Sequence, residues 1–208
     1  MGDWRYIQLI FYFKDCRIKI SFYFFALLSV AALSDRSGIT LCGLIAALLH
    51  ESGHIAAMLA LPDQAPAEIT LSPFGVRIEK RPLSEFGRGN VLILAAGSGV
   101  NFLCAAVTFG FFPRFAAVSL ILGILNILPV EGMDGGGILI ILLSRHSHAG
   151  FSGYAAKVIS WTTLCAMSLI GTYVLIVTKY NFTLLGMTAA LALKSRKPTA
   201  DRQFNGRF

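Results

Sequence analysis

Long apolar runs separated by short polar segments dominate the pattern of hydrophobic and polar positions along the chain. A transmembrane helix needs about 20 consecutive apolar residues to cross the hydrocarbon core of a bilayer. The runs that reach or approach this length are Ile18–Leu33, Ile39–Leu61, Asn90–Phe112, Ala116–Leu143, Val158–Thr178 and Phe182–Leu193. The pattern therefore predicts an all-α polytopic membrane protein with about six transmembrane helices.

Two segments depart from this helical pattern. The run Ala116–Leu143 is interrupted by Pro129, Gly132 and acidic residues, which predicts one broken helix. Broken backbone at membrane depth is tolerated only where it lines protein or a wet cavity. In the loop 62–89, apolar residues alternate from Ile69 to Ile78 around a Pro-Phe-Gly turn, which predicts a short cytoplasmic β-hairpin. It is either a plain surface hairpin or an edge that can hold an extended peptide.

The composition excludes several other classes of protein. Hydrophobic residues make up 55% of the 208 residues and charged residues only 14%, whereas roughly a quarter of a soluble domain is charged. A soluble fold and a disordered chain are both excluded, because neither accommodates so much apolar sequence. The four cysteines form no close pair, so a disulfide framework is not predicted.

The basic residues set the predicted orientation. Fifteen of the eighteen Lys and Arg residues fall on the side of the N-terminus in a six-span topology. Cytoplasmic loops retain basic residues, so both termini are predicted to be cytoplasmic. No nucleic-acid partner is predicted, because the net charge of +7 is spread over four loops. Residues 1–193 are predicted to form a single transmembrane domain, and residues 194–208 a short basic tail on anionic lipid.

Four ionisable residues lie within the predicted spans, namely His50, Glu51, His54 and Asp134. An acidic residue at the centre of a membrane helix costs about 2.5–3.5 kcal/mol on insertion scales, so each of these residues needs a partner or a function. His50 to His54 fits the pattern H-E-x-x-H. Residues four apart share one face of a helix, so the two histidines can bind one metal ion. Glu51 can then act as the base that takes a proton from an attacking water.

A catalytic zinc site usually has three protein ligands, so one is still to be found. Asp134 is the best candidate because it follows the break in the fourth run, although it could instead cap the helix that follows. Glu131 is an alternative, and His146 and His148 are weaker ones, because they flank Ser147 in a cytoplasmic loop. The structural alternative for the histidine pair is polar packing between helices.

The paired motifs resemble those of the site-2 protease family of intramembrane zinc metalloproteases, most closely the bacterial stage IV sporulation protease type. The likeness runs from about residue 39 to 143. It rests on four motifs: His50-Glu-Ser-Gly-His54, Ser-Pro-Phe-Gly in the hairpin, Ala95-Ala-Gly-Ser-Gly-Val-Asn101, and Asn126-Ile-Leu-Pro-Val-Glu-Gly-Met-Asp134-Gly-Gly.

The resemblance implies specific roles for the residues in these motifs. His50, His54 and Asp134 would bind one zinc ion, and Glu51 would be the catalytic acid and base. Asn126 and Asn101 would position the substrate. The chain departs from the usual motifs by Ser98 and Gly132, where prolines are common, and by the charge of Glu131, so substrate handling could differ. For Asn101 the structural alternative is a hydrogen bond between helices, and for residues 95–99 it is close packing of small side chains.

The function implied is a metalloendopeptidase in the bacterial cytoplasmic membrane that performs regulated intramembrane proteolysis. The substrate class would be a membrane-associated or membrane-spanning regulatory protein, such as a pro-sigma or anti-sigma factor, with control from a separate regulatory membrane protein. The alternatives are a non-catalytic membrane scaffold, an ion transporter that retains a metal site, and a membrane zincin of another lineage. A transporter predicts paired broken helices, and the sequence contains one break.

Overall fold

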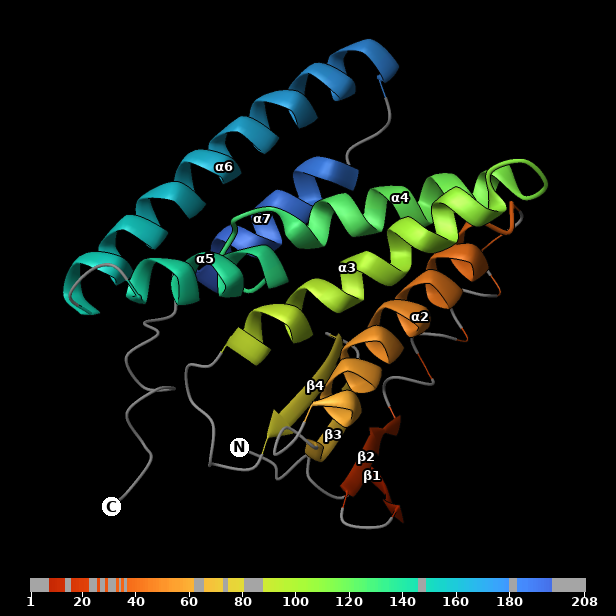
Figure 1. Ribbon diagram of the computed structural model, residues 1–208. Coiled ribbons are helices and arrows are strands. Elements are labelled where there is room, and N and C mark those ends of the chain that lie inside the picture. The colour runs from red at the N-terminus through yellow and green to blue at the C-terminus, as the bar shows by residue number, and fades with distance from the viewer. Residues whose placement is uncertain are drawn as a thin grey trace, which may run out of the picture. The chain divides into compact units, whose positions relative to one another are not determined.

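The protein is mostly helical, with a small β-sheet (Figure 1). The computed structural model describes residues 8–13, 16–22, 37–61, 66–72, 75–80, 88–145, 149–179 and 183–195, together with positions 26, 29, 33 and 35. The chain forms two compact units, Met1–Ile124 and Leu125–Phe208, and each is described by itself. The predicted single domain of residues 1–193 stays a prediction.

The sheet of the first unit has four strands in the order β1-β2-β3-β4. These strands are β1 (Gln8–Phe13), β2 (Cys16–Ser21), β3 (Pro66–Ser72) and β4 (Gly75–Lys80). Strands β3 and β4 pair antiparallel, with Ile69 opposite Ile78, which confirms the predicted hairpin. Residues 73 and 74 of its turn lie outside the described residues. Strand β1 pairs antiparallel with β2, and β2 runs parallel to β3.

Strands β1 and β2 were not predicted, so the sheet is larger than the expected hairpin. The predicted helical span Ile18–Leu33 is wrong over its first residues, because β2 continues to Ser21. The signal was present in the sequence, since Arg17 and Lys19 alternate with Ile18 and Ile20 in the two-residue period of a strand. Pairing with β3 satisfies the backbone groups of β2, and a short apolar run does not by itself distinguish a strand from the start of a helix.

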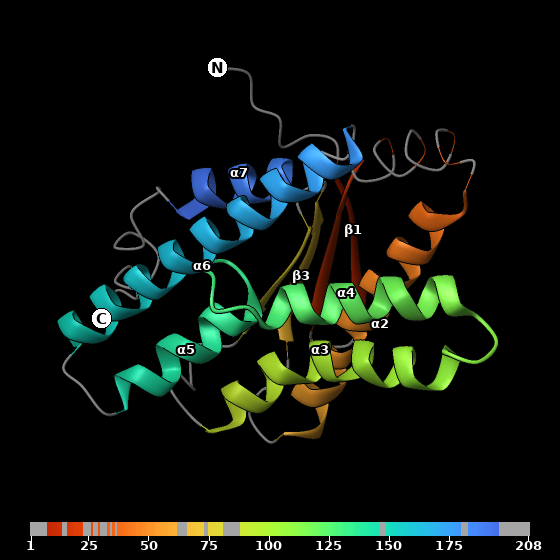
Figure 2. The ribbon, with the colours of Figure 1, turned by 90° about the horizontal axis from the view of Figure 1, so that it is seen from above.

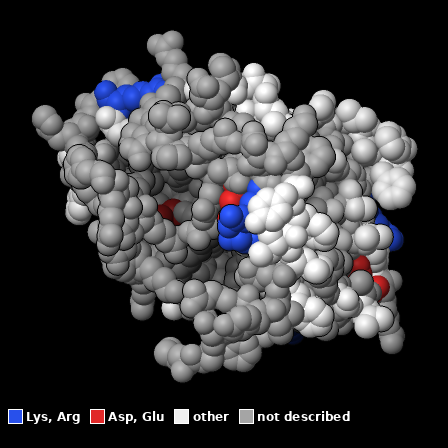
Figure 3. All heavy atoms as spheres, turned by 90° about the horizontal axis from the view of Figure 1, so that it is seen from below, with Lys and Arg blue, Asp and Glu red and all other residues white. Residues whose placement is uncertain are grey.

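An acidic side chain on β3 joins the two halves of the sheet. Lys19 lies 2.6 Å and Arg17 3.7 Å from the carboxylate of Glu68. The hydrogen bond from Lys19 is the main cause that holds the pKa of Glu68 below its usual range. Figure 3 shows basic and acidic side chains next to one another on one face of the molecule. The two ion pairs of Glu68, with Arg17 and with Lys19, link the parallel strands β2 and β3.

Helices α2 (Ile39–Ala60), α3 (Arg88–Thr108) and α4 (Pro113–Ile127) belong largely to the same unit. Helix α2 packs along α3, and its other contacts include β3 of the sheet. A short turn at residues 109–112 joins α3 to α4, and these two helices run beside one another (Figure 2). Gly53 on α2 and Gly123 on α4 both face α3 closely, and both are buried. Small residues at these positions let the three helices approach closely.

The turn before α2 is held by one carboxylate. Oδ1 of Asp35 accepts hydrogen bonds from the backbone N–H groups of Ser37 and Gly38, and Oδ2 accepts one of 2.7 Å from Thr40. The Ser37 hydroxyl also donates to Oδ1 and is the main cause that lowers the pKa of Asp35. The carboxylate therefore satisfies N–H groups at the start of α2 that have no partner within the helix.

We expect Asp35→Ala to speed hydrogen exchange at the Thr40 amide several-fold and to lower the Tm at pH 7. Because the pKa of the folded state is lowered, the stabilisation is fully present above the ordinary value of 3.8 and declines as the pH falls below it. The Tm difference between wild type and Asp35→Ala should therefore shrink from pH 7 towards pH 2. A difference that stays constant over this range would contradict the assignment. Thermal unfolding in detergent measures it.

The second unit holds α5 (Asp134–Ser144), α6 (Ala149–Thr178) and α7 (Thr183–Ser195). Helix α6 packs against both α5 and α7. The core of this second unit contains Val130, Leu164, Met167 and Leu191. Helix α4 ends at Ile127 and α5 begins at Asp134, so the predicted break in the run Ala116–Leu143 is confirmed.

Among the described residues, three helices are long and apolar enough to cross a membrane, and they are Ile39–Ala60, Gly89–Thr108 and Phe151–Thr178. Helices α4, α5 and α7 are apolar but shorter. Large apolar side chains on two of the long helices are exposed, as Leu103 (63%) and Leu169 (73%) illustrate, which suits contact with lipid. The structure supports a membrane protein, and six crossings remain a prediction.

Candidate metal centre

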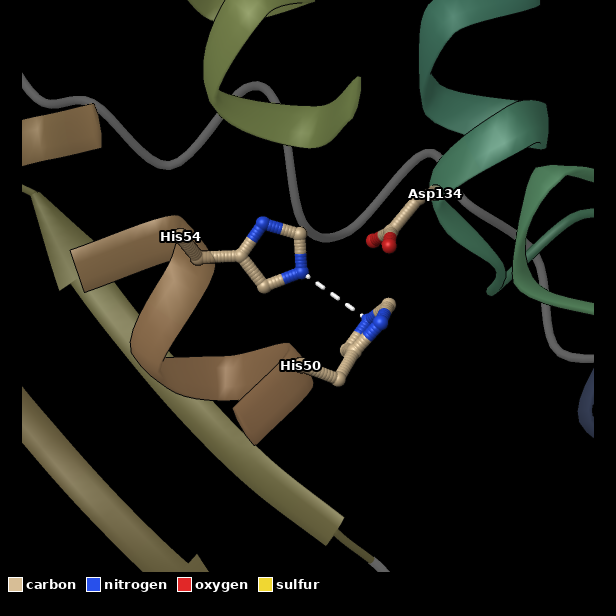
Figure 4. A group of neighbouring side chains, drawn as sticks. All are labelled: His50, His54 and Asp134. Carbon is tan, nitrogen blue, oxygen red and sulfur yellow. Dashed lines mark hydrogen bonds between the residues drawn. The ribbon is translucent and has the colours of Figure 1, made fainter. Parts of the chain in front are cut away.

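Two histidines form the centre of the site in the first unit. His50 and His54 lie one turn apart on α2, and both are buried, with 5% and 6% of their surface exposed. Their Nε2 atoms are 3.1 Å apart, and the rings meet edge to face (Figure 4). The predicted common face is confirmed. Two imidazole nitrogens that point at one another this closely can also turn to a shared metal ion.

The orientation of His54 is set by the backbone of α3. Its Nδ1 lies 2.7 Å from the carbonyl oxygen of Ile93. A carbonyl only accepts hydrogen bonds, so Nδ1 of His54 carries the proton and donates it. In the neutral ring Nε2 is then left with its lone pair, the form in which histidine binds metal. The side chain is therefore oriented as a metal ligand by a contact that involves no metal.

Asn101 contacts the other histidine. Its Nδ2 lies 3.2 Å from Nδ1 of His50, and the residue is fully buried, with 0% exposed. This contact joins α3 to α2 and matches the alternative of a hydrogen bond between helices. Ile93, Gly97 and Asn101 follow one another at intervals of four residues, so they form one stripe on α3 that faces the two imidazoles.

Gly97 lies at the middle of this stripe, against the rings. A Cβ atom at this position would lie 2.5 Å from Nε2 of His54 and 2.8 Å from Cε1 of His50. On the opposite side of the contact, a Cβ at Gly53 would lie 2.8 Å from the carbonyl oxygen of Ala96. The expected close packing of small residues is confirmed at Gly97 but not at Gly99, which is exposed and has no neighbour within 4 Å of its Cβ position in the described part of the chain.

Asp134 belongs to the second unit, where it begins α5 (Figure 4). The residue that caps α5 is Met133, so Asp134 lies in the first turn, where a carboxylate is also favoured by the helix dipole. A Cβ at Gly135 would collide with the carbonyl of Ile127, and one at Gly136 with that of Val130. The loop between α4 and α5 therefore folds back onto the start of α5, which holds Asp134 in place.

Glu131, the alternative ligand, is bound by other helices of its unit. Its carboxylate accepts a hydrogen bond of 3.0 Å from the hydroxyl of Ser195 on α7. Its backbone N–H donates to the hydroxyl of Ser160 on α6, which in turn donates to the carbonyl of Pro129. Gly132 follows with a φ of 93°, a conformation that favours glycine. These bonds assign Glu131 a structural role in fixing the break.

Comparisons with known proteins bear on the fold. The chain matches the model of no known sequence family and no curated protein sequence. It resembles the solved structure of the site-2 protease from Methanocaldococcus jannaschii, with a TM-score of 0.62 and 22% sequence identity. The match covers 90% of this chain and 93% of that one. The chain therefore has the fold of a site-2 protease.

For two of the remaining predicted site residues, Glu51 and Asn126, the structure gives the helix and the degree of burial. Glu51 follows His50 on α2 and is half-buried, and Asn126 lies half-buried near the end of α4. His146 and His148 lie outside the described residues. The contact of Ile93 with His54 and the position of Gly97 against the two rings were missed in the sequence, although the four-residue intervals from Ile93 through Gly97 to Asn101 were visible there. A backbone carbonyl that orients a ligand leaves no mark in the choice of side chain.

Proposed function

We propose that this protein is a zinc-dependent intramembrane endopeptidase of the site-2 protease type. The observation that carries the proposal is the buried histidine pair, in which the Ile93 carbonyl orients His54 as a ligand. The fold that the chain shares with a solved site-2 protease supports it. A histidine pair that only packs between helices does not need a carboxylate beside it, whereas this motif places Glu51 directly after His50.

His50, His54 and Asp134 are the proposed zinc ligands. Each would contribute one ligand atom, with the two histidines from the first unit and the carboxylate of Asp134 from the second. Two imidazoles and a carboxylate are a donor set that suits zinc and leaves the fourth position open. Glu131 is the weaker choice because Ser195 already donates to its carboxylate.

The chemistry follows from these residues. A bound zinc ion would supply Lewis-acid polarisation of the scissile carbonyl and of the attacking water. Glu51 takes a proton from the attacking water while the oxygen of that water bonds to the carbonyl carbon. Glu51 then passes the proton to the amide nitrogen as the C–N bond breaks. In H-E-x-x-H the carboxylate directly follows a ligand, which keeps it near the reacting atoms without its being a ligand.

The substrate is proposed to be a membrane-associated or membrane-spanning regulatory protein of the pro-sigma or anti-sigma factor type, as in the sporulation proteases that the motifs resemble. His54 lies seven residues before Leu61, which corresponds to roughly 10 Å of helix. With the termini in the cytoplasm of a bacterial cell, this depth puts the histidines in the inner half of the bilayer. A separate regulatory membrane protein is the proposed source of control.

Substitution of the acidic residues tests the ligand set. We expect Asp134→Asn to lower the bound zinc from one ion per chain to a small fraction of that, because a neutral amide is a poor zinc ligand. Glu131→Gln should retain zinc, because an amide oxygen can still accept from Ser195. The measurement is zinc content of the purified protein, with cleavage of a co-expressed membrane-tethered reporter alongside.

The converse result would overturn this ligand set. If Glu131→Gln lost zinc while Asp134→Asn kept it, Glu131 would be the third ligand. If wild type held no zinc and left the reporters intact, the protein would be a scaffold and not a protease.

A further inference from the structure

The contact between Asn101 and His50 carries an inference about how the site accepts its metal. Asn101 is fully buried, and its amide lies against His50 on one side. On the other side α4 approaches so closely that a Cβ at Gly123 would lie 3.3 Å from the Cβ of Asn101. Helix α4 therefore seals this side chain inside the first unit, where it contacts a ligand and is screened from any substrate.

The direction of the amide decides which nitrogen of His50 carries a proton. Here Nδ2 donates to Nδ1 of His50, so the proton of the neutral ring is on Nε2. That Nε2 faces the Nε2 of His54 at 3.1 Å, and the latter holds a lone pair because His54 donates from Nδ1. These contacts form a donor-to-acceptor series that runs from the amide of Asn101 through His50 and His54 to the carbonyl of Ile93.

Metal binding requires the opposite arrangement at His50. If Nε2 of both histidines binds the ion, His50 must carry its proton on Nδ1, and that proton needs an acceptor. The amide oxygen of Asn101 can accept it once the amide turns over about its χ2 torsion. In the observed orientation this Oδ1 is buried and has no hydrogen-bond partner among the described residues. Oxygen and nitrogen of an amide have nearly the same size, so the turn needs no extra space.

We propose that Asn101 is a positioning residue of the metal site, whose amide switches from donor to acceptor when zinc binds. In this role it fixes the tautomer and ring direction of His50, in place of the substrate contact that the motif suggested. The inference rests on the proposed function, because it requires that His50 and His54 bind metal. It predicts that an acceptor at position 101 is what the zinc site needs.

Two substitutions test whether the zinc site needs a hydrogen-bond acceptor at position 101 or only a side chain of that volume. Asn101→Asp supplies only acceptors, so we expect its zinc affinity to stay within about threefold of wild type, as for the carboxylate–histidine–zinc arrangement. Asn101→Leu has nearly the same volume but no acceptor, and we expect zinc binding about 10–100-fold weaker. Ser98→Ala is the matched control, since Ser98 is also fully buried on α3 and its hydroxyl has no partner among the residues described. Zinc affinity is measured by competition with a chelator in detergent.

The wild-type protein provides a second measurement that needs no substitution. The ¹⁵N shifts of the His50 ring distinguish a protonated from an unprotonated nitrogen. We expect Nδ1 to be unprotonated without metal and protonated with zinc. If Asn101→Leu fails to fold, this measurement alone decides.

Three results would overturn the inference while leaving the protease proposal intact. They are wild-type zinc affinity in Asn101→Leu, equal weakening in a folded Asn101→Asp, and a Nδ1 that carries its proton in both states. Failure of the wild-type protein to bind zinc at all would instead overturn the proposed function, and this inference with it.

Discussion

Replacement of Glu51 by Gln is expected to lower the rate of peptide cleavage by about 10²–10⁴-fold, the usual contribution of a general acid and base. The amide can neither take the proton of the attacking water nor return one to the leaving nitrogen. Bound zinc should be unchanged, because His50, His54 and Asp134 are the proposed ligands. Loss of turnover with full metal content is the result that separates a catalytic residue from a ligand.

Cleavage of a membrane-tethered reporter and zinc content are measured on the same preparations. Ser52→Ala is the matched control, because Ser52 is the next residue on α2, is exposed, and its hydroxyl donates to the carbonyl of Leu49 within the same helix. It should cleave like wild type. Sustained cleavage by Glu51→Gln would exclude Glu51 as the acid and base of the proposed mechanism, whereas a reporter left intact by wild type as well would favour a scaffold or transporter that retains a metal site.

Gly97→Ala is expected to weaken zinc binding about 100-fold while the protein stays folded. The added methyl group would lie 2.5 Å from Nε2 of His54 and 2.8 Å from Cε1 of His50, so both rings must move. Side chains can yield where backbone cannot, so the cost falls more on the ligand geometry than on the fold. Changes that disturb the orientation of metal-binding histidines typically cost about 10–100-fold in metal affinity.

Gly99→Ala provides the control on the same helix, because no atom of the described residues lies within 4 Å of the Cβ it would add. Alanine is also the better helix former, so this variant should be at least as stable as wild type. Zinc affinity by chelator competition and Tm are compared across the three proteins. Wild-type zinc affinity in Gly97→Ala would mean that α3 does not lie against the imidazoles as described.

The local features of the chain were largely predictable. The H-E-x-x-H spacing predicts a common face for His50 and His54, because the period of a helix is a local property, and the structure confirms it. The break before Asp134 and the hairpin of β3 and β4 were predictable for the same reason, since Pro, Gly and a two-residue alternation act on the nearest few residues. The membrane class followed from composition alone.

The N-terminal strands show where local reasoning stops. Residues 16–21 are apolar enough to begin a span and alternate enough to form a strand, and only the partner decides between them. That partner is β3, some fifty residues later, which pairs with β2 in parallel and brings Glu68 to Lys19. Long-range pairing of this kind is not encoded in either segment alone.

Within the site, the sequence by itself determined which residue types could bind a metal and how they recur along a helix. The tertiary structure decided which atoms meet them. Gly97 and Gly99 are both small and lie two residues apart, which turns them to different faces of α3, and only the packing of α2 shows which one faces the rings. The Ile93 carbonyl and the Asn101 amide act through direction and distance, and these exist only once the helices have packed.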